Sequence, residues 1–395
     1  MPYWVLFRAP CQAYSFMGRA KLIGEFGRET YEADARHFLY REYLRIIARH
    51  RPPVFVMENV KGLLTAKRKE EGIFQRILED LKNPVDAVYG PRRNGRATKL
   101  TYRLVSLVVR NGDLLGVHDP EDYLVRSENY GIPQARHRII ILGINTDDDA
   151  HPRLLQPKTV VPIEDVISDL PRLRSGLSRE PDSVEAWRQA LLTIPESAWF
   201  SDAKITDTQR GEIRRRLGEL NGHLARGSEI VQPTRRAVRA HAEWFTDPRL
   251  GAICNHCTRL HIRADLHRYF FAATFATVHG RSPLLADFPP QLLPNHKNVA
   301  QALTDRKFND RFRVQMSDRP STTITSHISK DGHYFIHYDP TQCRSLTVRE
   351  AACLQTFPDN YFFEGPRTEQ YQQVGNAVPP LLAHQIAEIV ADLFV

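Results

Sequence analysis

Several residues of this sequence could take part in chemistry, and each stands where a predicted strand or helix ends. Cys11 follows Pro10, directly after the apolar run 3–7. Ligands of α/β sheets bind beyond the carboxyl ends of the strands, and a thiolate is a strong nucleophile when nearby charge lowers its pKa. The alternative is that Cys11 is a small buried hydrophobic residue, which is the commoner role of a lone cysteine.

Two further segments place charged side chains beside predicted strands. Glu58 and Asn59 follow a buried apolar run, where a carboxylate can act as an acid or as a hydrogen-bond anchor. Arg136 and Arg138 stand two residues apart, so both side chains point the same way in an extended chain. The arginine fork binds phosphate or carbonyl oxygens. Each segment alone is also compatible with an ordinary surface position.

The carboxyl-terminal part holds two more such segments. Residues 344–359 contain an Arg-x-x-Thr-x-Arg-Glu pattern, and a helix is predicted over 346–355. Residues 373–380 read Gln-Val-Gly-Asn-Ala-Val-Pro-Pro, and prolines at a first helical turn predict a closing helix over 379–393. Free backbone N–H groups at such a turn can bind a small ligand.

The arrangement of predicted elements favours an α/β fold. Strands are expected over 3–7, 54–57, 102–109 and 139–144, and helices over 34–49 and 73–82. Their alternation predicts a mostly parallel sheet. From about residue 150 prolines, arginines and short polar stretches dominate, and regular periodicity returns near residue 316. We therefore expect a first α/β part over 1–149, an insert over 150–315, and a second α/β part over 316–395.

Composition limits the class of protein. The 395 residues are 42% hydrophobic, which is enough for one large or two moderate domains. The net charge of +8 and the pI near 9.2 favour a polyanionic partner such as nucleic acid. Five cysteines are too few, and odd in number, for a disulfide framework, which indicates a reducing compartment. No apolar run approaches the roughly 20 residues of a membrane helix, so a soluble cytoplasmic protein is expected.

Taken in order, five motifs resemble those of the cytosine carbon-5 DNA methyltransferase family. They are Pro-Cys-Gln at 10–12, Glu-Asn-Val at 58–60, Gln-x-Arg-x-Arg at 134–138, Arg-x-x-Thr-x-Arg-Glu at 344–350 and Gly-Asn-x-Val-Pro at 375–379. The resemblance covers residues 1 to about 145 and about 316 to the end. It implies a Rossmann-like methyltransferase domain with a smaller inserted target-recognition domain over 150–315.

The resemblance also implies residue roles. Cys11 would add to carbon 6 of a cytosine flipped out of the duplex, so that carbon 5 can attack a methyl donor. Glu58 would hydrogen-bond the ring N3 and the exocyclic amine, and Arg138 would contact the base carbonyl with support from Arg136. The residues implied to shape the same pocket are Gln12, Asn59 and Gln134. The implied donor is S-adenosylmethionine, and its implied contacts are Pro10, Asn376, Ala377 and Val378.

One part of the family pattern is not found. The Gly-rich turn and the acidic residue with which the family holds its donor precede the catalytic loop, and the chain begins at the strand before that loop. We therefore expect an N-terminally incomplete methyltransferase domain. Three explanations stay open: a truncated product, one half of a split enzyme whose second polypeptide supplies the donor site, or a degenerate remnant that binds DNA without methylating it.

The insert holds candidate DNA contacts. The basic clusters Arg214–Arg216 and Arg235, Arg236 and Arg239 either grip phosphates or form a solvated surface. A polar segment could contact bases or could bond within the insert; it contains Asn255, His256, Arg259, His261, Asp265, Arg268 and Tyr269. Of these, Arg259 and Arg268 are our predicted DNA contacts. Cys254 and Cys257 form a single Cys-x-x-Cys pair, and because a zinc site needs four ligands, no metal site is predicted.

Two alternative functions remain. An RNA cytosine methyltransferase of the same family would share the catalytic residues, but its Cys-Phe-Thr signature is not found and the long basic insert favours duplex DNA. A non-catalytic DNA-binding subunit is the second alternative. The expected setting is a cytoplasmic, nucleoid-associated enzyme of restriction–modification or phage defence, by analogy with the family.

Overall fold

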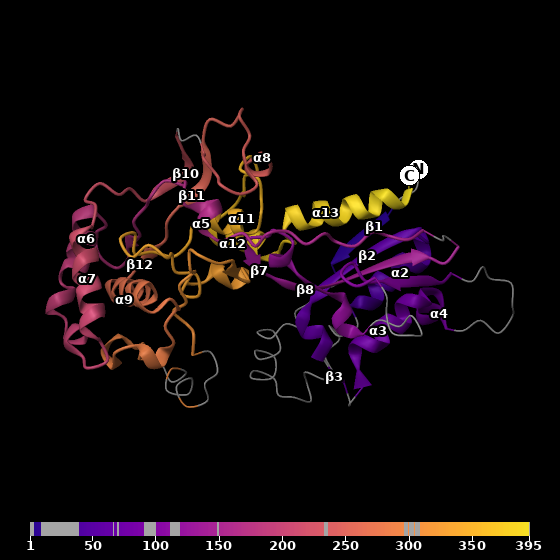
Figure 1. Ribbon diagram of the computed structural model, residues 1–395, viewed down its shortest axis with the longest axis horizontal. Helices are drawn as coiled ribbons and strands as arrows, with labels where there is room; N and C mark the ends of the chain where they lie inside the picture. Colours follow the sequence, from indigo (N-terminus) through magenta and orange to yellow (C-terminus); the bar gives the residue numbers. More distant parts are fainter. Residues whose placement is uncertain are drawn as a thin grey trace. The chain divides into compact units, whose positions relative to one another are not determined.

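The computed structural model of the protein describes most of the chain, which forms two compact units (Figure 1). The described residues are 4–8, 39–65, 67–68, 71–90, 100–110, 119–147, 150–232, 236–295, 299, 304 and 309–394. Unit 1 comprises Met1–Tyr130, Arg136–Lys158 and Leu382–Val395, and unit 2 comprises Gly131–Ala135 and Thr159–Leu381. The short segment Gly131–Ala135 therefore packs with unit 2, although the chain on both sides of it belongs to unit 1.

Unit 1 is built on a five-stranded sheet in the order β1-β2-β8-β5, with β6 also paired to β8. The strands are β1 (Trp4–Arg8), β2 (Val54–Val60), β5 (Tyr102–Val105), β6 (Leu124–Arg126) and β8 (His137–Asn145). The prediction of a mostly parallel sheet is wrong for these strands. Only β1 and β2 pair in parallel, whereas β8 is antiparallel to β2, β5 and β6.

The path of the chain explains the direction of β8. Helices α3 (Ile73–Lys82) and α4 (Pro84–Tyr89) carry the chain from β2 to β5, which runs in the same direction as β2. A parallel neighbour requires such a crossover. Between β5 and β8 the described residues contain β6, the two-residue strand β7 (Gln134–Ala135) and 3-10 turns but no helical crossover, and β8 enters the gap between β2 and β5 in the opposite direction.

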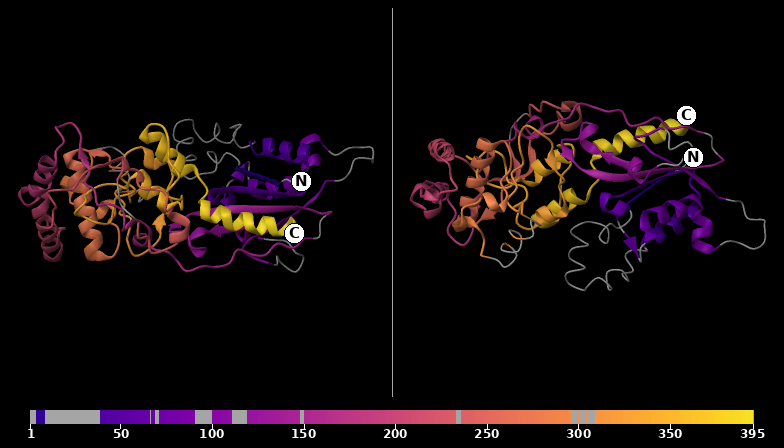
Figure 2. Two further views of the ribbon diagram at one scale, coloured as in Figure 1. Left: turned by 90° about the horizontal axis from the view of Figure 1, so that it is seen from above. Right: turned by 60° about the horizontal axis from the view of Figure 1, so that its bottom comes forward.

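Helices cover both faces of this sheet. Figures 1 and 2 show α2 (Tyr40–His50), α3 and α4 on one face and α13 (Pro380–Ala391) on the other. The apolar stripe of α2 follows a helical period, with Tyr43, Leu44 and Ile47 buried against the sheet side chains of the same core. An antiparallel pair of two-residue strands, β3 (Lys67–Arg68) and β4 (Glu71–Gly72), precedes α3.

The predicted strand over 102–109 is too long. It ends at Val105 because the Ser106 hydroxyl oxygen accepts hydrogen bonds from the backbone N–H groups of Val108 and Val109, both at 3.0 Å. Such a local side-chain bond competes with the sheet ladder for the same N–H groups. The other strand and helix predictions in unit 1 agree with β1, β2, β8, α3 and α13 to within a few residues, and residues 34–38 of the predicted first helix lie outside the described residues.

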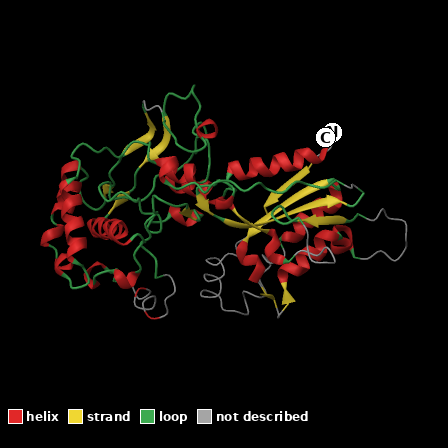
Figure 3. Cartoon of the chain, viewed as in Figure 1, coloured by secondary structure: helices red, strands yellow, loops and turns green. Residues whose placement is uncertain are grey.

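Unit 2 consists of short elements joined by long loops (Figure 3). Its helices are α5 (Glu164–Ile167), α6 (Val184–Leu192), α7 (Asp207–Gly218), α8 (Ala242–Phe245), α9 (Arg263–His279), α11 (Val348–Leu354) and α12 (Arg367–Asn376). Its strands are β7 (Gln134–Ala135), β9 (Gly176–Leu177), β10 (Gly227–Val231), β11 (Ile253–Cys257), β12 (Leu260–His261) and β13 (Ser321–Thr322). The strands β10 and β11 form an antiparallel pair, while β9–β12 and β7–β13 are short parallel pairs.

Two apolar clusters hold unit 2 together. In the first, α9 packs against α6 and α7, with Trp187 and Phe271 fully buried. In the second, α11 is surrounded by β11, α5 and α12, and all seven of its residues are buried. The segment predicted to be helical over 346–355 is therefore a central helix of this cluster.

One stretch, Arg367–Phe394, is long and apolar enough by composition to be considered as a membrane span. This stretch is not one continuous helix, because α12 ends at Asn376 and α13 begins at Pro380. The 12 residues of α13 fall short of the roughly 20 that cross a bilayer. Its apolar side chains, including Leu382 and Ile389, are buried within the protein.

Candidate active site

The antiparallel pairing of β2 and β8 brings Glu58 and Arg138 together. Val60 lies opposite Arg138 and Glu58 opposite Ile140, so Glu58 and Arg138 stand on one face of the sheet, one diagonal step apart. The Arg138 Nε atom is 3.0 Å from Glu58 Oε1. Glu58 is 3% exposed and Arg138 9%. A carboxylate this buried requires compensation of its charge, and the Arg138 guanidinium supplies the opposite charge.

The neighbours of Arg138 orient it further. Its Nη1 atom donates to the carbonyl of His137 at 2.8 Å, and the His137 ring lies 2.7 Å from Glu128 Oε1. Burial opposes ionisation of Glu128, but the hydrogen bond from His137 and nearby positive charge outweigh it, so the pKa of this carboxyl is lowered. An ionised Glu128 holds the strand end that carries Arg138.

Arg136 is 1% exposed and is held through its backbone. Its N–H donates to the Ser127 hydroxyl at 3.0 Å, and its carbonyl accepts from the Ser127 N–H at 3.3 Å. Ser127 is fully buried, and we did not predict it from the sequence, where a lone serine before a loop carries no distinguishing signal. Arg136 thus packs inside unit 1 near the strand that carries Arg138.

Asn59 stands beside Glu58 on β2 and is 1% exposed. Its Oδ1 atom accepts a hydrogen bond from the Val60 N–H at 2.8 Å. Its Nδ2 atom is buried and has no acceptor among the residues that the structure describes. Leaving such a donor unpaired costs about 1–3 kcal/mol. The amide of Asn59 is therefore available to a ligand or to a segment outside the described residues.

Gln134 lies in unit 2, where its fully buried amide is bonded on both sides. The Nε2 atom donates to the Leu354 carbonyl at 3.2 Å and to Gln355 Oε1 at 2.9 Å. The Oε1 atom accepts from the Ile324 N–H at 2.8 Å. The predicted scaffold residue is therefore a bridge between the Gln-x-Arg-x-Arg segment and the end of α11.

Gln355 extends this bridge to the turn after α12. Its Nε2 atom donates to the Val374 carbonyl at 2.7 Å and lies 3.4 Å from the Ala377 carbonyl. Sequence reasoning did not single out Gln355, although it stands inside the recognised segment 344–359. Through Gln355 the segment that precedes Arg136 and the predicted donor turn share one buried hydrogen-bond chain.

The donor turn itself is open to a small molecule. Asn376 is exposed, and Ala377 and Val378 are partly exposed. Gly375 allows the close approach that builds this turn, because a Cβ there would lie 2.3 Å from the Ser326 backbone N. An exposed amide beside the first turn of α13 suits the polar parts of an adenosine-type ligand, so these residues fit the implied donor.

The Arg-x-x-Thr-x-Arg-Glu segment is a buried structural network. Arg344 meets Glu350 through two contacts of 2.7 and 2.6 Å, and Glu350 also accepts from the Thr347 N–H at the start of α11. Burial opposes ionisation of Glu350, but the Arg344 guanidinium overcomes it and holds the pKa of Glu350 well below its ordinary value. His256 from β11 contacts the Thr347 hydroxyl at 3.0 Å, which ties the insert to α11.

The predicted DNA contacts Arg259 and Arg268 make bonds within unit 2. Arg259 donates to the carbonyls of Ser329 and Lys330, both at 3.1 Å, and its guanidinium stands 4.0 Å above the ring of Tyr371. Arg268 donates to Asp265 at 2.7 Å and to the carbonyl of Leu292. Most of the polar segment is likewise bonded inside the fold, since Asn255 bonds Phe363 and Tyr269 bonds His333.

The basic clusters of the insert are also partnered. Arg215 and Arg216 pair with Glu212 and Glu219 along α7, and Arg214 stands over the ring of Phe200. Arg236 is buried between two carboxylates, and Arg239 is largely exposed at 3.8 Å from Asp165. These contacts favour a solvated, self-paired face for the α7 cluster.

The Cys-x-x-Cys pair is engaged by protein groups. Arg367 donates to Cys257 Sγ at 3.2 Å, and the two ring nitrogens of His256 contact Thr347 and the Pro171 carbonyl. Over the described ranges there is no group of three or more side chains that could hold a metal ion.

Four predicted residues lie outside the part of the chain that the structure describes: Pro10, Cys11, Gln12 and Arg235. The described pocket residues still define a chemistry. A buried carboxylate accepts hydrogen bonds from ring N–H or amino groups, and an adjacent arginine donates to a carbonyl oxygen.

Comparison with known proteins shows the family to which the chain belongs. The sequence model of the family described as C-5 cytosine-specific DNA methylase matches residues 5–84 and 118–391. The type II methyltransferase M.Bpa9945I of Bacillus paralicheniformis is 33% identical over 389 residues, which span 97% of this chain and 69% of the relative. M.AgeI of Thalassovita gelatinovora is 27% identical over 96% of this chain and 81% of its own length. M.DdeI of Desulfomicrobium norvegicum is 23% identical over 98% of this chain and 71% of its own length.

Proposed function

Because the chain belongs to the C-5 cytosine-specific DNA methylase family, we propose that it methylates carbon 5 of a cytosine flipped out of duplex DNA, with Cys11 as nucleophile. The observation that carries this proposal is the buried pair of Glu58 and Arg138 on adjacent strands. Its two side chains supply the acceptor and the donor that hold a cytosine by its polar edge.

The proposed reaction begins with addition of the Cys11 thiolate to carbon 6 of the ring. Carbon 5 of cytosine is a poor nucleophile, and the new C–S bond turns the ring into an enamine in which carbon 5 is electron-rich. A proton shared between the Glu58 carboxyl and N3 stabilises the negative charge that moves toward N3, while Glu58 also accepts a hydrogen bond from the exocyclic amine. After carbon 5 has gained the methyl group, a base such as water takes the carbon-5 proton, the C5–C6 double bond re-forms and the C–S bond cleaves, which releases the Cys11 thiolate.

Arg138 is proposed to donate to the base carbonyl, and Arg136 to position the strand that carries Arg138. The proposal further assigns Asn59, with its buried amide donor, and Gln134 and Gln12 to support of the bound base. Because Glu58 and Arg138 are already desolvated and paired, they need little reorganisation when the base enters.

The proposed methyl donor is S-adenosylmethionine, which supplies an electrophilic methyl group when it is bound. On this chain Asn376, Ala377 and Val378 would contact it, together with Pro10. The support is the exposed turn after α12 and the hydrogen bond that joins this turn through Gln355 to Gln134.

We assign residues 150–315 to target recognition and residues 1–149 and 316–395 to catalysis. Duplex DNA is the substrate that the family implies, which disfavours the RNA alternative, and restriction–modification is the proposed setting because the relatives are type II methyltransferases. Arg259 and Arg268 stay predicted DNA contacts; each would have to exchange bonds within unit 2 for bonds to phosphate.

A methyl-transfer assay tests the function. Mixed-sequence duplex DNA and tritiated S-adenosylmethionine are incubated with the full chain, with Cys11→Ser, and with Cys257→Ser as a matched thiol control. We expect label at carbon 5 of cytosine with the unchanged chain and the control, and none with Cys11→Ser. Label on adenine, or transfer by Cys11→Ser, would overturn the proposal. DNA binding without any transfer would favour the non-catalytic alternative.

A further inference from the structure

Residues 236–247, here named the strap, cross the second apolar cluster of unit 2 between β10 and β11. The backbone N–H groups of Arg239 and Ala240 donate to the Asp165 carbonyl at 3.0 and 3.3 Å. The carbonyl of Phe245 accepts from the Asp359 N–H at 2.9 Å. The strap is therefore bonded both to α5 and to the segment that follows α11, rather than being a free surface loop.

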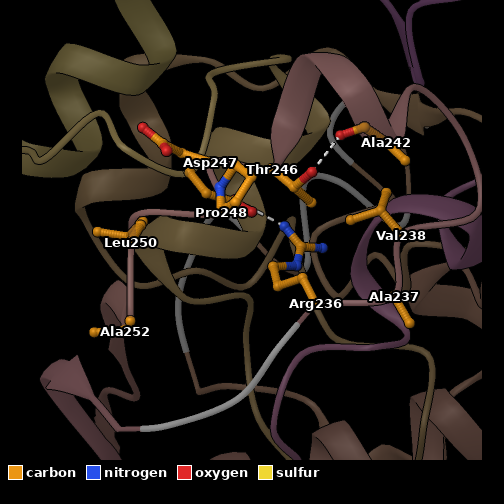
Figure 4. Close-up of a pocket in the computed structure, with 11 residues that line it drawn as sticks. Arg236, Ala237, Val238, Ala242, Thr246, Asp247, Pro248, Leu250 and Ala252 are labelled. Atoms are coloured by element: carbon orange, nitrogen blue, oxygen red, sulfur yellow. Dashed lines mark hydrogen bonds and ion pairs between the residues drawn. The ribbon is translucent and has the colours of Figure 1, made fainter.

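Arg236 anchors the start of the strap. Its guanidinium meets Asp169 at 2.7 Å and Asp359 at 2.8 Å, and only 4% of its side chain is exposed. Figure 4 shows Arg236 among the residues that line a cavity of about 740 Å³, with the Thr246 hydroxyl directed to the Ala242 carbonyl. Two buried ion pairs fix this end of the strap in direction and position.

His241 stands at the middle of the strap in an unfavourable backbone conformation. Its φ is +55° and its ψ +37°, the left-handed region that side chains with a Cβ rarely adopt. In this conformation its Nε2 atom reaches the Gly131 carbonyl at 2.7 Å. Trp244, one turn later, donates from Nε1 to the Thr356 carbonyl at 2.8 Å. The left-handed backbone of His241 is maintained together with a short side-chain hydrogen bond, which indicates that the surrounding structure favours this contact.

The accepting carbonyl belongs to the segment that leads into the pocket arginines. Gly131 has a φ of +79°, so the chain turns sharply there. The next residues are fixed by β13 and the residue that follows it, since the Ser321 N–H donates to the Pro133 carbonyl at 3.0 Å and the Thr323 hydroxyl to the Ala135 carbonyl at 2.7 Å. Arg136 follows Ala135 directly in the chain.

We propose that His241 is a positioning residue: by donating from Nε2 to the Gly131 carbonyl, it fixes the turn from which the chain enters Arg136 and Arg138. The recognition insert thereby sets the geometry of the base-binding arginines without touching the base. The catalytic consequence rests on the proposed function, whereas the hydrogen bond and its effect on the segment do not.

The variants separate the hydrogen bond from the backbone conformation. His241→Gly removes the donor while favouring a positive φ, so it does not add backbone strain. His241→Gln restores a side-chain N–H of similar reach. His223→Gly, at an exposed histidine of the same unit, is the matched control. Amide hydrogen exchange is measured on the full chain without DNA, and kcat and KM are measured for methyl transfer.

We expect His241→Gly to raise exchange at residues 131–138 about five- to tenfold, the effect of one lost hydrogen bond, with exchange in β2 unchanged. It should lower kcat by a similar factor with KM for DNA little changed, and His241→Gln should recover most of both. The inference is overturned if His241→Gly and His223→Gly show equal exchange at residues 131–138. It is also overturned if the enzyme is active and His241→Gly leaves kcat unchanged. If the unchanged chain transfers no methyl group, the proposed function fails, and the exchange experiment still decides the role of His241.

Discussion

The Arg138 guanidinium and the Glu58 carboxylate meet at 3.0 Å because β8 runs antiparallel to β2 with Val60 opposite Arg138. A shift of the register by one residue would turn Arg138 to the other face of the sheet. The direction of one strand therefore decides whether these two side chains meet. This relationship also leads to the first prediction, since each partner compensates the buried charge of the other.

Arg138→Ala should lower the free energy of unfolding by about 3 kcal/mol, because it leaves Glu58 buried without its charged partner. Adding Glu58→Gln should restore at least part of this loss, which makes the two changes non-additive. Urea unfolding of the two single variants and the double variant measures the coupling. Additive losses would show that the two side chains do not interact.

Gln355→Ala should destabilise the chain by about 2 kcal/mol or more, because it leaves the Gln134 amide and the Val374 carbonyl buried without this partner. Gln373→Ala removes the same side chain from the exposed face of α12 and should change stability by less than about 0.5 kcal/mol. Equal unfolding midpoints in urea for the two variants would contradict the assigned bridge.

Gly375→Ala should destabilise the chain by about 1–3 kcal/mol, because the added Cβ would lie 2.3 Å from the Ser326 backbone N and α12 would have to shift. Gly211→Ala in α7 meets nothing within 4 Å and should instead stabilise its helix by about 1 kcal/mol. Thermal unfolding of both variants tests the pair. A gain in stability for Gly375→Ala would refute the close packing at the donor turn.

Buried histidines predict how stability depends on pH. Burial lowers the pKa of His256 to about 4 and that of His337 to about 3. In the unfolded chain histidine titrates near pH 6.5. Between about pH 6.5 and 4 the unfolded state therefore binds protons that the folded state does not, and stability falls as the pH falls. Each such histidine adds a slope of about 1.4 kcal/mol per pH unit.

His256→Gln should accordingly reduce this slope by about one proton, whereas His223→Gln at an exposed site should leave the slope of the unchanged chain. Urea unfolding at several pH values between 4.5 and 6.5 gives both slopes. Identical slopes for the two variants would mean that His256 is protonated in the folded protein.

The apolar periodicity of the sequence predicted most helices and strands of unit 1, whereas the contact between Glu58 and Arg138 depends on how the strands pair. The helix α3 was predicted over its full length because its apolar stripe depends only on neighbouring residues. The reversal of β8 was missed because strand direction depends on the path of the chain between β5 and β8, which periodicity does not report. The contact of Glu58 with Arg138 depends on that reversal and was not predicted; the family resemblance implied only that both side chains bind the same base.

The insert was harder to interpret from the sequence. Arg259 and Arg268 were predicted to face DNA because their segment is polar, yet the structure directs their guanidinium groups to backbone carbonyls and to Asp265. The sequence shows that a side chain is polar, but it does not show whether that side chain bonds to solvent, to DNA or to other groups of the protein. Gln355 was missed for the related reason that its partners, Gln134 and Val374, are distant in sequence.

The most direct test of the central claim is covalent trapping on duplex DNA that contains 5-fluorocytosine, in the presence of S-adenosylmethionine. Fluorine at carbon 5 blocks the final elimination, so an adduct through carbon 6 persists and migrates as a protein–DNA complex under denaturing conditions. We expect a stable adduct with the full chain and with Cys257→Ser, and none with Cys11→Ser. An adduct that survives Cys11→Ser, or methylated fluorocytosine DNA without any adduct, would contradict this expectation.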